Sequence, residues 1–156
     1  MTSVRRLAAL SLSAAAFLSA CSVEEEVTTP MEPVGDMKET MDWVLDPAAD
    51  VIWGFAGFVT TAEGEIDLAP KDEEDWARVK HAAWVLAESG NLLMVPGLAE
   101  EGADWLEYSQ GLRTMGGRLI EIAEAQDPEA LFEAGGHLYN ICLACHQAYA
   151  RELRQD

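Results

Sequence analysis

Apolar residues at helical spacing are the strongest pattern in this chain. Through residues 103–125 they recur at steps of three and four without a miss, at Trp105, Tyr108, Leu112, Met115, Leu119 and Ile122. Such a period lines one face of a helix with apolar side chains, and that face needs a partner that covers it. The segment is therefore predicted to be a long amphipathic helix packed against others.

Residues 37–60 carry a similar stripe, which begins at Met37 and Met41 and continues to Phe55. Asp46-Pro47 interrupts it. The pair can kink one helix, or it can start a new one with Asp46 as N-cap and Pro47 at the first helical position. Because the stripe keeps its phase across the pair, one kinked helix is favoured.

Two more helices are predicted from capping residues and period. One begins after Asp72 and ends near Gly90 as C-cap, and it follows a loop at residues 64–71. The other begins after Asp127 and reaches about residue 154. We find no β-alternation of useful length. Four helices with short connections predict an all-α fold, an antiparallel four-helix bundle over residues 36–156.

The first residues read as an export signal rather than as part of the fold. Residues 1–20 hold two arginines followed by an apolar run that is too short to span a membrane in the mature protein. The run ends at Cys21 in a sequence that resembles the bacterial lipoprotein box, which implies a lipid on Cys21. An ordinary signal that happens to contain a cysteine is the alternative. Residues 21–35 are acidic and proline-containing, and we expect a flexible tether.

The charge balance excludes some partners. The chain has a formal net charge of −18 at pH 7. Removal of residues 1–20 takes away Arg5 and Arg6 and lowers the charge further. Such a chain should repel nucleic acid and anionic membrane surfaces. Contact with a membrane is therefore expected through lipid alone.

Near the C-terminus stands Cys142-Leu143-Ala144-Cys145-His146. C-x-x-C-H is the attachment signature of c-type haem, because two cysteines one helical turn apart can form thioethers with the two vinyl groups and the next histidine can bind the iron. A redox dithiol is a rival, but the strand-then-helix context of such motifs is missing. A zinc site would need further ligands at suitable spacing, and His81 and His137 are isolated.

With this motif on the last predicted helix, the chain resembles the class II cytochromes c, meaning cytochrome c′ and its Met-ligated relatives. The resemblance implies a four-helix bundle of the cytochrome c′ type with one covalent haem c, thioethers from Cys142 and Cys145, and His146 as proximal ligand. The family divides on the distal ligand. Met41 resembles the ligating position best and Met37 comes second, while an open distal site is the third possibility.

The predicted function is that of a lipid-anchored periplasmic cytochrome, at the outer membrane, that carries single electrons between redox partner proteins and is not an enzyme. The alternative is a five-coordinate haem protein that binds nitric oxide or carbon monoxide. A peroxidase would need a distal acid–base group, and no residue can be assigned to that role. Relatives often pair as homodimers through their first helices, and no residue here decides whether this chain does.

Overall fold

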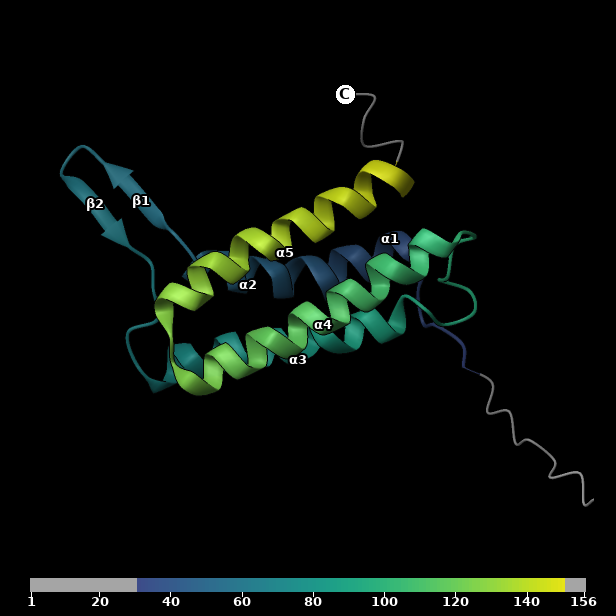
Figure 1. The fold of residues 1–156 in the computed structure, drawn as a ribbon, viewed down its shortest axis with the longest axis horizontal. Coiled ribbons are helices and arrows are strands. Elements are labelled where there is room, and N and C mark those ends of the chain that lie inside the picture. The colour runs from purple at the N-terminus through teal and green to yellow at the C-terminus, as the bar shows by residue number, and fades with distance from the viewer. Residues whose placement is uncertain (1–30, 151–156) are drawn as a thin grey trace, which may run out of the picture.

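The computed structural model describes residues 31–150, which are mostly helical (Figure 1). Its elements are α1 (Met37–Thr40), a π-helical turn η1 (Met41–Leu45), α2 (Asp46–Phe55), β1 (Phe58–Thr61), β2 (Gly64–Asp67), α3 (Glu73–Leu92), α4 (Ala103–Ala125) and α5 (Pro128–Tyr149). None of the helices in this range is long and apolar enough to cross a membrane. The expected signal at residues 1–20, the lipid site Cys21 and residues 151–154 of the expected last helix lie outside the described residues.

The helices pack around one apolar core. α3 lies along α4, α4 contacts α5, and α2 contacts both α3 and α5. The largest fully buried apolar side chains come from all four of these helices: Ile52, Val79, Leu86, Leu119, Leu131 and Leu138. The predicted apolar stripes supply this core, and the expectation of a helical domain is confirmed.

The first predicted helix continues through Asp46-Pro47 instead of restarting there. Asp46 makes no side-chain capping bond, and its backbone N–H donates to the carbonyl of Met41, five residues earlier. In a regular helix the ring of Pro47 would clash with the carbonyl of Trp43. The wider π-helical turn directly before Pro47 relieves that conflict, so the chain continues as a helix into α2.

The end of the first helix was predicted too late, and the hairpin was missed. α2 ends at Phe55, where Ala56 leaves the helical conformation, and β1 pairs antiparallel with β2 over Phe58–Asp67. Val59, Thr60 and Thr61 are β-branched and favour strands. Gly64, at φ +135°, closes the turn in a conformation that other residues rarely adopt. This hairpin protrudes from the helical body (Figure 1).

Both predicted aspartate N-caps are confirmed. The Asp72 carboxylate accepts the backbone N–H of Asp75 at 2.9 Å, and the Asp127 carboxylate accepts that of Ala130 at 3.0 Å. Each satisfies one of the N–H groups that a helix start leaves without a partner. α4 has the predicted bounds, whereas α5 ends at Tyr149, earlier than expected, because Ala150 leaves the helical conformation.

Gly90 was predicted to end the second helix, and this is wrong. It lies inside α3, where an added Cβ would come within 2.6 Å of the backbone of Ser109 and Arg113 on α4. Gly116 lies on α4, where an added Cβ would come within 2.5 Å of the backbone of Ala87 on α3. The two glycines let α3 and α4 pack backbone to backbone.

Candidate functional site

The two cysteines of the C-x-x-C-H motif lie on the core-facing side of α5. Cys142 and Cys145 are both half-buried and pack against the apolar core, and neither forms a disulfide. His146, the next residue, is exposed in the last turn of the helix. The two thiols therefore share the core-facing side of the helix, whereas the imidazole of His146 lies at the surface.

The surroundings keep both thiols protonated. Burial, together with the neighbouring Cys142 and the Asp104 carboxylate, raises the pKa of Cys145 to about 11. Burial also raises the pKa of Cys142, to which the Asp46 carboxylate on α2 contributes. Nucleophilic and redox-active cysteines have lowered pKa values instead. These two are therefore unlike a catalytic dithiol.

Burial of α5 falls toward the motif. Leu131, Ala134 and Leu138 in its first half are fully buried, whereas Ile141, Cys142 and Cys145, which continue the same stripe, are only half-buried. In the described chain, no Cα of α1 or of η1 lies within 8 Å of a Cα of α5. In Figure 1 the C-terminal half of α5 diverges from α1. The apolar stripe at this end is thus incompletely covered by protein.

Met37 and Met41 lie on α1 and at the first position of η1. Both are half-buried and pack against the same core as the two cysteines. Met41 differs from Met37 because its carbonyl accepts the N–H of Asp46 and so defines the π-helical turn. Single π-helical turns inside helices are frequent at functional sites. The sequence identified the two methionines but gave no sign of the turn.

The other two histidines lie elsewhere. His81 on α3 is exposed beside Trp84, and His137 is exposed on the outer side of α5 near Asn140. Within residues 31–150, no three side chains of histidine, cysteine, aspartate or glutamate come together as a candidate metal cluster.

The tryptophans do not all belong to the core. Trp76 and Trp105 are buried, whereas Trp43 is 79% exposed and Trp84 is 51% exposed. The periodicity of the sequence did not separate these cases, because a residue at the edge of a stripe is covered or exposed according to the neighbouring helix. Two surface grooves also escaped sequence reasoning, one between α2 and α5 and one between η1 and α3.

Comparisons of the chain with protein-family models, with curated proteins and with solved structures found no match.

Proposed function

We propose that this protein is a c-type cytochrome that carries single electrons, built as a four-helix bundle of the cytochrome c′ type from α2 with its leading turns, α3, α4 and α5. One observation carries the proposal: Cys142 and Cys145 share the core-facing side of α5 at the end where its apolar stripe is incompletely covered. Helices in direct contact pack with their axes about 8–10 Å apart. α5 makes no such contact with α1 or η1 in the described chain. A flat apolar group attached to the two cysteines would cover the half-buried part of the stripe.

The residues at this end have the chemistry that a covalent haem needs. Cys142 and Cys145 would hold it by thioethers, and His146 would bind its iron from α5. Met41 would be the opposite ligand, with Met37 the second choice, because both pack against the same core as the cysteines. Such a group supplies one-electron redox chemistry at its iron, and a Met/His ligand pair raises its potential.

The chain's own residues would set the conditions of electron transfer. The buried core behind Ile141 and Leu138 keeps water from one side of the site, and burial of this kind helps to set a redox potential. Asp46 and Asp104 place negative charge beside the cysteines, which favours the more positive, oxidised state of a nearby centre. Lipid on Cys21 would hold the protein at the outer membrane, facing the periplasm.

Visible spectra of the purified full-length protein test the proposal. We expect one covalent haem that remains with the chain after acid–acetone extraction. The ferric spectrum should be low-spin, and the reduced spectrum should be unchanged by carbon monoxide. A chain without covalent haem would overturn the cytochrome proposal. A high-spin spectrum that carbon monoxide changes would instead favour the five-coordinate protein that binds nitric oxide or carbon monoxide, with Met41 covering an open site.

A further inference from the structure

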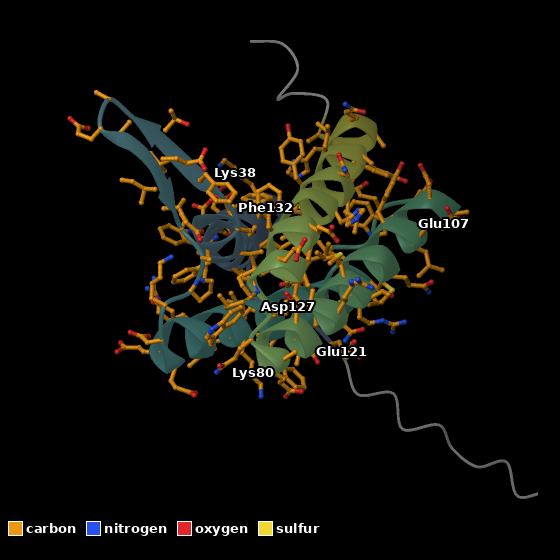
Figure 2. All side chains as sticks on the ribbon, turned by 60° about the vertical axis from the view of Figure 1, so that its left-hand side comes forward. Lys38, Lys80, Glu107, Glu121, Asp127 and Phe132 are labelled. Atoms are coloured by element: carbon orange, nitrogen blue, oxygen red, sulfur yellow. The ribbon has the colours of Figure 1, made fainter. Side chains whose placement is uncertain are left out.

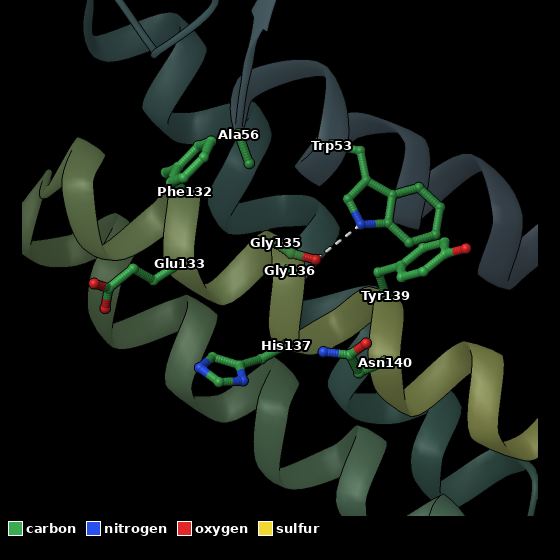
Figure 3. Close-up of a pocket in the computed structure, with 9 residues that line it drawn as sticks. All are labelled: Trp53, Ala56, Phe132, Glu133, Gly135, Gly136, His137, Tyr139 and Asn140. Atoms are coloured by element: carbon green, nitrogen blue, oxygen red, sulfur yellow. Dashed lines mark hydrogen bonds between the residues drawn. The ribbon is translucent and has the colours of Figure 1, made fainter.

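An open groove of about 710 Å³ runs between α2 and the first half of α5. Three aromatic side chains line it, those of Trp53, Phe132 and Tyr139, together with Glu133 and the backbone of Gly136 (Figure 3). The groove belongs to the part of α5 that precedes the C-x-x-C-H motif. It is therefore separate from the proposed haem site.

The walls of the groove are held in place by α2 and α5 themselves. The indole Nε1–H of Trp53 donates to the carbonyl of Gly135 at 3.1 Å, as Figure 3 shows. An added Cβ on Gly135 would lie 2.7 Å from the Cβ of Ala56, so the two helices meet closely at this point. The ring of Trp53 also packs edge-on against Tyr139, with 6.3 Å between centroids. Because these contacts fix the walls of the groove, its side chains would lose little conformational freedom when a ligand binds.

The hairpin extends this aromatic surface. Phe58 of β1 lies 5.6 Å from Phe132, ring centroid to ring centroid. Phe58, Phe132 and Tyr139 are each at least half exposed, and Ile66 of β2 is exposed as well. A contiguous cluster of exposed large apolar side chains indicates an interaction surface.

The negative charges around the groove favour a positively charged partner. Glu133 lines it, and the adjoining hairpin exposes Glu63, Glu65 and Asp67. Lys71, which follows the hairpin, is paired with Asp67 at 3.8 Å. A second copy of a chain with net charge −18 would bring like charges against these carboxylates, and an anionic membrane would do the same. A cationic partner is attracted both by the carboxylates and by the faces of the aromatic rings.

We propose that this groove, with Phe58 of the hairpin at its edge, docks a basic segment of a partner protein. One lysine or arginine side chain of that segment would lie against Trp53 and Tyr139, and another would pair with Glu133, which lies farther along α5 (Figure 3). The proposal does not depend on haem, because none of these residues belongs to the C-x-x-C-H motif or to the turns that hold Met37 and Met41.

Titration of the full-length protein with a capped peptide of alternating arginine and glycine tests the proposal, at neutral pH and low ionic strength. The citrulline version of the peptide keeps its shape without its charge. Gly136→Leu fills the groove from a position with nothing within 4 Å of an added Cβ, so it should leave the fold intact. Gly117→Leu is the matched control, since Gly117 on α4 is equally open. Glu133→Gln is compared with Glu107→Gln, which removes the same charge far from Phe132 (Figure 2).

We expect Gly136→Leu and Glu133→Gln each to weaken arginine-peptide binding by roughly fivefold or more, the size of one cation–π or charge-pair contact. Gly117→Leu and Glu107→Gln should change it less than about twofold, and the citrulline peptide should not bind. Equal effects of both charge variants would mean diffuse attraction and would overturn the proposal. So would a dimer of the chain that Gly136→Leu dissociates, or binding of the groove to zwitterionic lipid vesicles in preference to the peptide.

Discussion

The hydroxyl of Tyr149 donates a hydrogen bond to a carboxylate oxygen of Asp104 at 2.7 Å. This contact joins the last residue of α5 to the first turn of α4. The Tyr149 ring also packs edge-on against Trp105, with 4.9 Å between centroids. The end of α5 that carries Cys145 and His146 is therefore held to the domain by Tyr149, where the stripe of α5 is otherwise incompletely buried.

The Tyr149–Asp104 contact is predicted to stabilise the folded state at neutral pH but not at high pH. The hydrogen bond from Tyr149 to Asp104, together with burial and the negative charge of Asp104, raises the pKa of Tyr149 to about 12. A pKa raised above the unfolded value of about 10 stabilises the folded state below pH 10, and this stabilisation is lost as pH rises toward 12. Tyr149→Phe should thus lower the free energy of unfolding at neutral pH and lose its effect near pH 12. Urea unfolding at both pH values measures this, and a deficit that is the same at both would contradict it.

Because α3 and α4 approach closely at Gly90, adding a single methyl group there is predicted to destabilise the folded protein. Gly90→Ala would place a Cβ 2.6 Å from backbone atoms of α4, which cannot move aside as a side chain can. We expect a loss of about 1–3 kcal/mol in the free energy of unfolding, measured by urea denaturation. Gly117→Ala is the control, because its Cβ would meet open space. It should be neutral or stabilising by up to about 1 kcal/mol. Equal effects of the two substitutions would refute this account of Gly90.

The proposed attachment predicts that both cysteines of the motif are required for covalent haem. The double variant Cys142→Ala/Cys145→Ala should yield a chain from which acid–acetone removes all haem, because no thioether can form. Each half-buried thiol is replaced by a smaller apolar group, so the helix itself should persist. Circular dichroism of the variant checks the helix, and the haem content after extraction checks the attachment. Full retention of haem would end the cytochrome proposal.

Met41 is predicted to be the distal ligand. Met41→Ala should open the site, shift the ferric spectrum toward high spin and admit carbon monoxide to the reduced protein. Met37→Ala is the matched control, one turn earlier on the same face and packed against the same core, and it should change the spectra little. If instead Met37→Ala opens the site while Met41→Ala does not, the ligand is Met37.

The lipid anchor predicts a mature chain that begins at Cys21. Mass spectrometry of the protein from membranes should find an acylated N-terminal cysteine. Cys21→Ala should release the protein from the membrane or leave its signal uncleaved, while covalent haem is unaffected. An unmodified N-terminus at another residue would contradict lipidation and would leave the haem proposal standing.

The sequence alone was enough to predict four helical segments and the position of the motif, although three of the helix ends differ in the structure. The stripe of α4 gave its bounds, because burial of a continuous face imposes one period on a long segment. Asp72 and Asp127 marked two helix starts, because a cap depends only on residues three or four positions away. The spacing of Cys142 and Cys145 likewise sets their common side of α5 through local helix geometry.

Only the tertiary structure decided what depends on a neighbouring element. Gly90 reads as a helix end until α4 is seen against it, and the same residue type can serve as a cap or as a site of close approach. The π-helical turn at Met41 follows from the conflict with Pro47, and the hairpin after Phe55 follows from strand pairing. Neither cause is visible in the spacing of apolar residues. Exposure of Trp43, burial of Trp76 and the groove between Trp53 and Tyr139 arise from how helices meet in space, which a one-dimensional pattern does not contain.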